Sequence, residues 1–169
     1  MTKKRFFSRF PLIFLLLLSL GCGEIRPVWK GEIKLANYEL FYSEPCEFQV
    51  NVPQIKDSLN VMLELVVTYY VGITRNNLPL FIVLEDQQHN VTEFTTNVVL
   101  KEEGEWLGMP EENEIDYTLT HVAIPEFNLN PGSYVLRLYA NDDSEEKVYG
   151  VVNIEARIFE VEAEPTPGL

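Results

Sequence analysis

The sequence has few of the residues that most often carry chemistry. It contains two cysteines and two histidines, and the histidines, His89 and His121, lie far apart in the chain. A zinc site needs converging His, Cys or carboxylate ligands at a recognisable spacing. There is also no G-x-S-x-G nucleophile motif and no glycine-rich phosphate loop. We therefore expect no metal, no cofactor and no enzymatic activity.

Basic residues are also scarce. Thirteen Lys and Arg stand against 26 Asp and Glu, which gives a formal net charge of −13. A strongly acidic chain repels nucleic acid and anionic lipid headgroups. The composition therefore argues against a nucleic-acid partner.

The chain has no apolar run long enough to cross a membrane, which would need about 20 residues. It opens with four basic residues and no acid, followed by the short apolar run Pro11–Leu20. This pattern is typical of an export signal that is cleaved, here residues 1–21. Cys22 directly follows the small Gly21 and resembles the acylated cysteine of the bacterial lipoprotein lipobox. Acyl chains on Cys22 would anchor the protein to a bilayer without spanning it.

The alternative is an ordinary secretory signal with an incidental cysteine. An oxidising compartment would then permit a disulfide between Cys22 and Cys46. If Cys22 is acylated instead, Cys46 has no partner. In both cases the only charged residues that cleavage removes are basic, so the mature chain carries nine basic and 26 acidic residues.

The body of the chain has the alternating pattern of β-strands. CEFQVNV places Phe48, Val50 and Val52 on one face, while NVMLELVVTYYV and LPLFIVLE are apolar runs that suit central strands. Turn residues separate seven or eight such segments, which predicts an antiparallel two-sheet β-sandwich. We expect residues 22–36 to be a lipidated tether, 37–162 the sandwich and 163–169 a disordered tail.

The stretch KEEGEWLGMPEENE, residues 101–114, joins two expected strands and places an apolar pair among acids. Gly104 and Gly108 can adopt positive φ on either side of Trp106 and Leu107. One interpretation is that Trp106 and Leu107 fold back and close one end of the core. The other is that Trp106 is an exposed docking residue, since Trp is common at interface hot spots.

Two acidic features are weaker candidates for chemistry. The pairs Glu102/Glu103 and Glu111/Glu112 could in principle act like the carboxylates of a glycosidase, but neighbouring acids are expected in so acidic a chain. The run 142–146 offers oxygen ligands for calcium, yet it lacks the order of an EF-hand. We expect a solvated turn there.

Three strings in order resemble the gliding-motility lipoprotein family GldH. They are YYVGITRNNLPLFIVL at residues 69–84, GEWLG at 104–108 and YGVVNIEARIFE at 149–160. The lipobox and the strand NPGSYVLRL add to the resemblance, which covers most of residues 22–162. Within the first string Tyr70, Arg75, Asn77 and Leu78 resemble family positions.

The resemblance implies a non-catalytic lipoprotein of the cell envelope that works with other motility and protein-secretion components. Only one acid, Glu24, closely follows Cys22, so we expect a periplasm-facing anchor in the outer membrane. The alternative function is a glycan- or peptide-binding sandwich, in which exposed aromatics such as Trp106, Tyr69 and Tyr70 stack on a ligand.

Overall fold

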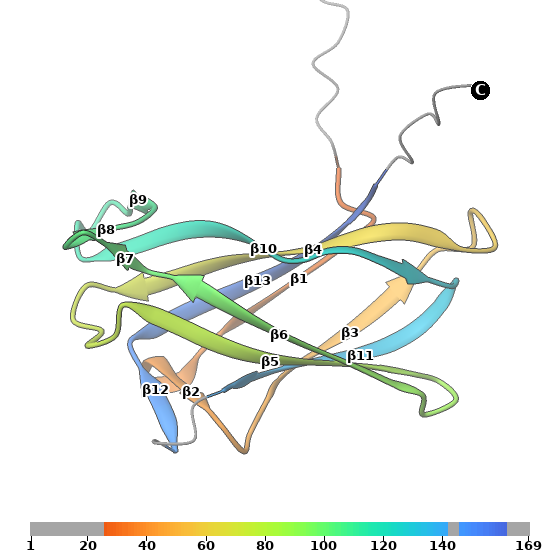
Figure 1. Ribbon diagram of the computed structural model, residues 1–169, viewed down its shortest axis with the longest axis horizontal. Coiled ribbons are helices and arrows are strands. Elements are labelled where there is room, and N and C mark those ends of the chain that lie inside the picture. The colour runs from red at the N-terminus through yellow and green to blue at the C-terminus, as the bar shows by residue number, and fades with distance from the viewer. Residues whose placement is uncertain (1–25, 142–145, 162–169) are drawn as a thin grey trace, which may run out of the picture.

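The computed structural model describes residues 26–141 and 146–161. Two antiparallel sheets face each other, one in the strand order β1-β13-β4-β10-β9 and the other in the order β3-β11-β5-β6 (Figure 1). Two short pairs, β2 with β12 and β7 with β8, complete the described part. The strands are β1 (Trp29–Lys34), β2 (Glu39–Phe41), β3 (Cys46–Val52), β4 (Leu59–Tyr70), β5 (Asn77–Asp86), β6 (Val91–Val99), β7 (Lys101–Glu102), β8 (Glu105–Trp106), β9 (Met109–Pro110), β10 (Asp116–Leu129), β11 (Gly132–Ala140), β12 (Lys147–Tyr149) and β13 (Val151–Glu160).

The predicted antiparallel sandwich is confirmed. Apart from the short β9, the two large sheets consist of eight strands with six or more residues each. A single 3-10 turn, Ala36–Tyr38, is the only helical element among the described residues. No helix in the described part is long and apolar enough to cross a bilayer.

Burial follows the period-2 pattern closely. In β3 every second residue is buried, including the predicted Phe48, Val50 and Val52. The run in β4 alternates over its whole length, so that Leu65 and its in-phase neighbours are fully enclosed. Burying one such side chain stabilises the fold by roughly 1.5–3 kcal/mol. β4 lies between β13 and β10, and β5 between β11 and β6, so both apolar runs are central strands as predicted.

The expected tether, residues 22–36, is wrong over residues 29–34. These residues form β1, which pairs with β13 from Trp29↔Ile158 to Lys34↔Asn153. The Trp29 ring packs edge-on against Phe48, with centroids 6.1 Å apart. Gly31 hides the pattern in the sequence, because the inward position between Trp29 and Ile33 carries no apolar side chain. Residues 1–25, including Cys22, and the expected tail 163–169 lie outside the described residues.

Candidate binding face

The GEWLG stretch forms a tight hairpin at one end of the sandwich. β7 pairs with β8 through Lys101↔Trp106 and Glu102↔Glu105, which leaves Glu103 and Gly104 as the two turn residues. Both have positive φ, 49° and 94°, as a two-residue type I′ turn requires. At the base of the hairpin the Leu107 N–H donates to the Leu100 carbonyl at 2.9 Å.

The hairpin packs its apolar pair onto the core. Trp106 and Leu107 are half-buried against the core cluster. The Trp106 ring lies 5.8 Å from the Tyr69 ring, and the Lys101 Nζ lies 4.5 Å above the Trp106 ring. The hairpin acids Glu102, Glu103 and Glu105 are exposed. Trp106 and Leu107 thus cover one end of the core, while the hairpin acids lie in water.

Tyr69 holds the base of this hairpin. Its hydroxyl lies 2.9 Å from the Leu100 carbonyl oxygen and 2.5 Å from that of Leu107, within donating distance of both. Burial raises the pKa of Tyr69 to about 12, with a smaller contribution from the Tyr117 hydroxyl. The sequence-based expectation that Tyr69 is an exposed stacking aromatic is wrong, because its side chain is fully buried. It points inward in phase with Leu65 and Val67.

Gly108 brings the chain against β10. Its φ is +94°, and a Cβ at this position would lie 2.4 Å from the Thr118 carbonyl oxygen. This close approach allows β9 to pair with Tyr117 and Thr118. A side chain at Gly104 would meet open space, so only its positive φ favours glycine there. The two glycines of the motif therefore serve different purposes.

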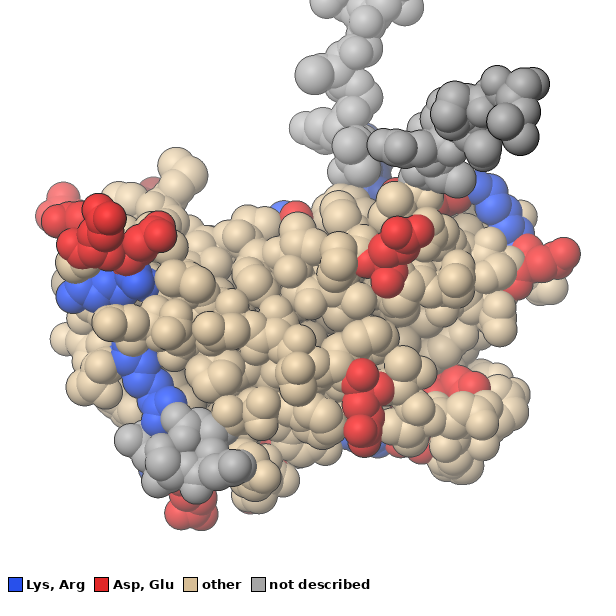
Figure 2. Space-filling view, viewed as in Figure 1, with Lys and Arg blue, Asp and Glu red and all other residues tan. Residues whose placement is uncertain are grey.

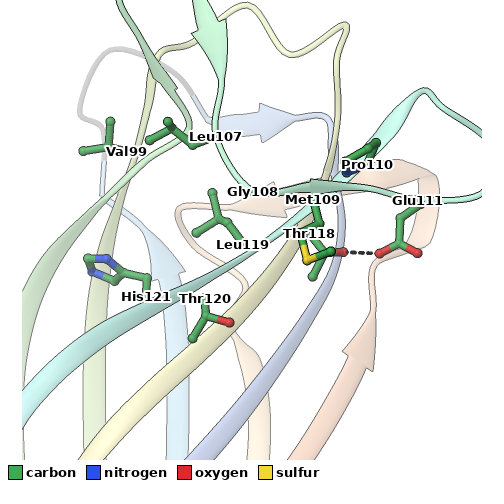
Figure 3. Close-up of a pocket in the computed structure, with 10 residues that line it drawn as sticks. All are labelled: Val99, Leu107, Gly108, Met109, Pro110, Glu111, Thr118, Leu119, Thr120 and His121. Atoms are coloured by element: carbon green, nitrogen blue, oxygen red, sulfur yellow. Dashed lines mark hydrogen bonds between the residues drawn. The ribbon is translucent and has the colours of Figure 1, made fainter.

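A cavity of about 710 Å³ opens between this segment and β10 (Figure 3). Met109 is 76% exposed at its mouth. In Figure 3 Met109 and Leu119 lie between His121 on one side and Glu111 on the other. Val99 from β6, Leu107 from the base of the hairpin and Pro110 from β9 complete the apolar part of the wall.

Three of the polar side chains that line the cavity, Glu111, Thr118 and His121, are bonded to protein atoms. The Thr118 hydroxyl donates to Glu111 Oε1 at 2.5 Å and lies 2.8 Å from the Thr68 hydroxyl. His121 Nε2 lies 2.7 Å from the Thr96 hydroxyl, and burial lowers the pKa of His121. His121 is bonded to Thr96 and therefore packs as part of the wall. The surface that remains open to a ligand is mainly apolar.

The histidines and acidic pairs that the sequence offered as candidates do not come together in one site. His89 lies in an exposed turn and pairs with Glu85 at 2.5 Å, far in the fold from His121. Glu111 and Glu112 are exposed, as are Glu102 and Glu103. No group of three or more His, Cys, Asp or Glu that could hold a metal occurs among the described residues. Most of the acidic run 142–146 lies outside the described part.

The face that carries β6 and β10 is almost uncharged. Figure 2 shows a broad area without Lys or Arg and with few acids across the middle of this side, while charged groups gather towards its ends. β6 contributes one acid, Glu93, and no basic residue. Elsewhere several charges on the outer faces of the sheets are paired, for example Arg137 with Glu47 and Glu85. The low charge of this side is therefore local, because the chain as a whole is strongly acidic.

Neither a family model nor a curated protein sequence matches the chain. Among solved structures it is similar to a CocE/NonD family hydrolase from Staphylococcus aureus, with 8% identity, a TM-score of 0.34 and coverage of 81% of this chain and 32% of that one. It is also similar to the CBM35 from Cellvibrio japonicus Abf62, with 11% identity, a TM-score of 0.33 and coverage of 80% and 99%. The chain thus spans about a third of the hydrolase. At these TM-scores neither likeness bears on function.

Proposed function

We propose that this protein is a non-catalytic lipoprotein of the bacterial cell envelope that binds other proteins. Its acylated Cys22 would hold the sandwich at the periplasmic side of the outer membrane. Its partners would be components of the gliding-motility and associated protein-secretion machinery, in keeping with the resemblance of residues 69–84, 104–108 and 149–160 to GldH.

The observation that carries the proposal is the nearly uncharged side of the sandwich, which has no Lys or Arg and few acids across its middle (Figure 2). In a chain with a net charge of −13, an uncharged area with exposed apolar side chains is typical of a protein interaction surface. Four apolar residues of β6, β9 and β10 are exposed, namely Val91, Val99, Met109 and Val122, by 53%, 41%, 76% and 46%. Charged residues are rare in the centre of protein interfaces, because burying an unpaired charge is costly.

The alternative of glycan capture loses part of its basis. It relied on stacking aromatics, but Tyr69 is fully buried and Trp106 is half-buried with Lys101 above its ring. Peptide capture does not depend on those rings. The cavity beside Met109 suits an apolar side chain, so peptide binding remains compatible with the proposed role.

Two measurements test the proposal. Cys22→Ser should move the protein from the membrane fraction to the soluble periplasmic fraction, and the wild-type protein should carry the mass of a diacylglyceryl adduct. Deletion of the gene should abolish spreading and reduce secreted proteins. A deletion strain that spreads and secretes normally would exclude the motility role, and a soluble wild-type protein would exclude the anchor.

A further inference from the structure

The edge of β6 leaves a row of backbone groups without strand partners. β6 is the last strand of its sheet and pairs only with β5 among the described strands. Asp86 N–H donates to the Asn90 carbonyl and Leu100 N–H to the Asn76 carbonyl. These two bonds join Asp86 with Asn90 and Asn76 with Leu100, at the two ends of the regular β5–β6 register. Because hydrogen-bonded pairs alternate along an antiparallel ladder, the even-numbered residues of β6 bond to β5. The N–H and C=O groups of Val91, Glu93, Thr95, Asn97 and Val99 therefore point away from the sheet.

The two edges of the other large sheet are protected, and β3, the opposite edge of the β6 sheet, is shorter at seven residues and lies beside β1. β1 carries Lys30, Glu32 and Lys34, and the ring of its Trp29 packs beside β3. β10 is interrupted by two irregularities in its register and contains Pro125. Charges, prolines and bulges are the usual means of preventing a strand from pairing at an edge. β6 has nine residues in unbroken register, without Pro, Gly or a basic residue.

Features at the two ends of β6 give the edge a direction. Val99, at its carboxyl end, lines the cavity that contains Met109 and Leu119. The hairpin next to this end exposes Glu102, Glu103 and Glu105, and no salt bridge is seen for these three acids within the described residues. At the amino end the acids already have partners: Glu85 binds Arg137 and His89, and Asp86 accepts from Asn90.

We propose that an extended segment of a partner protein adds to β6 as an antiparallel strand. The segment is uncharged along β6, places an apolar side chain near its amino end in the cavity beside Met109, and carries a basic residue just before it, next to the hairpin acids. Backbone hydrogen bonds to the odd-numbered residues supply affinity, while the cavity and the acids fix register and direction. This inference rests on the proposed role in protein binding and specifies where and how the partner binds.

A second copy of this chain fits the edge less well. Antiparallel pairing of β6 with itself around Thr95 would place the acidic hairpin of one copy beside the Glu85–Asp86 end of the other. The hairpin acids would find no unpaired basic group there among the described residues, and each chain has a formal charge of −13, so two copies repel each other overall. A basic residue at the end of a peptide would instead be attracted to the hairpin acids.

The test uses the full chain in detergent and a synthetic peptide of about nine alternating Val and Thr residues preceded by two Lys, matched to the length of β6. Amide hydrogen exchange followed by NMR should slow at least about tenfold at Glu93, Thr95 and Asn97 when the peptide is added. Even-numbered amides of β6, which already bond to β5, should change much less. Moving the two Lys to the carboxyl end should weaken binding.

Thr95→Pro is the matching variant, because it removes an outward N–H and no bond to β5. It should weaken peptide binding about tenfold or more with little change in melting temperature, while Thr95→Val should bind like the wild type. If Thr95→Pro does not fold, a peptide N-methylated at alternate residues tests the same bonds on the wild-type chain and should fail to bind.

The results separate this inference from the function on which it rests. Unchanged exchange at millimolar peptide, or equal binding by Thr95→Pro, would overturn the strand-addition proposal. Slowing at the same amides without peptide, rising with protein concentration, would overturn it in favour of a second copy. A folded Thr95→Pro protein that restores spreading to a deletion strain would refute the docking edge and leave the motility role standing. Normal spreading in the deletion strain would refute the motility role and leave the docking edge standing.

Discussion

Replacing Trp106 by Ala tests whether the hairpin closes the core. A fully buried Trp costs about 3–5 kcal/mol when truncated to Ala, and Trp106 is half-buried. The contact with the Tyr69 ring at 5.8 Å adds roughly 0.5–1.5 kcal/mol beyond the lost burial. The Lys101 Nζ at 4.5 Å adds about 0.5–1 kcal/mol because the site is partly in water. We therefore expect a loss of about 3 kcal/mol in the free energy of unfolding.

Urea unfolding of the full chain, followed by Trp and Tyr fluorescence, measures this loss. Trp29 remains as a reporter in the variant. Lys101→Met is the control for the cation–π contact and should lose no more than about 1 kcal/mol. If Trp106→Ala unfolded within about 1 kcal/mol of the wild type, the ring would not be closing the core. The docking interpretation of Trp106 would then be favoured.

Three further predictions concern the interior. Tyr69→Phe leaves the Leu107 carbonyl without its hydroxyl partner and should cost about 1–3 kcal/mol in the free energy of unfolding; a neutral change would contradict the anchoring of the hairpin by Tyr69. Leu65→Asp buries a charge in a fully enclosed position and should unfold the domain in circular dichroism, whereas Val66→Asp, half-buried on the opposite side of β4, should cost far less. Burial raises the pKa of Cys46 from 9.0 to about 11 and of Tyr69 from 10.0 to about 12; because the unfolded chain loses these protons first, stability should be undiminished below pH 9 and fall between pH 9 and 12. Cys46→Val should remove the earlier part of that fall, and an unchanged profile would show that the thiol does not contribute.

Much of the fold could be predicted because the strands of a two-sheet sandwich alternate between core and solvent. The period-2 pattern located β3, and long apolar runs located β4 and β5. It failed at β1, where Gly31 takes an inward position beside the Trp29 ring and removes the apolar residue that would have marked the strand. The short strands of the hairpin escaped for a different reason. Two residues are too few to show any period.

The site was less predictable, although one signal was present. Counting in twos from Leu65 through Val67 reaches Tyr69, so its phase already indicated an inward side chain, and Tyr70 was the outward one. The bond between His121 and Thr96 had no such signal, because it joins strands of different sheets. The exposed edge of β6 depends on strand order. Strand order is set by how the whole chain packs and leaves no mark in the nine residues themselves.

The hairpin of residues 101–107 joins the two interpretations of Trp106 that the sequence left open. Trp106 and the Tyr69 hydroxyl fix the hairpin on the core, and the fixed hairpin holds Glu102, Glu103 and Glu105 beside the carboxyl end of β6. A loss of docking in Trp106→Ala would therefore follow even if its ring never touched a partner, because the acids would no longer be held in place. Substitutions of the acids themselves separate the two effects, since these side chains lie in water and contribute little to stability. The apolar residue of the motif thus supports the structure, while the strand-addition proposal assigns the contact with a partner to the acids beside it.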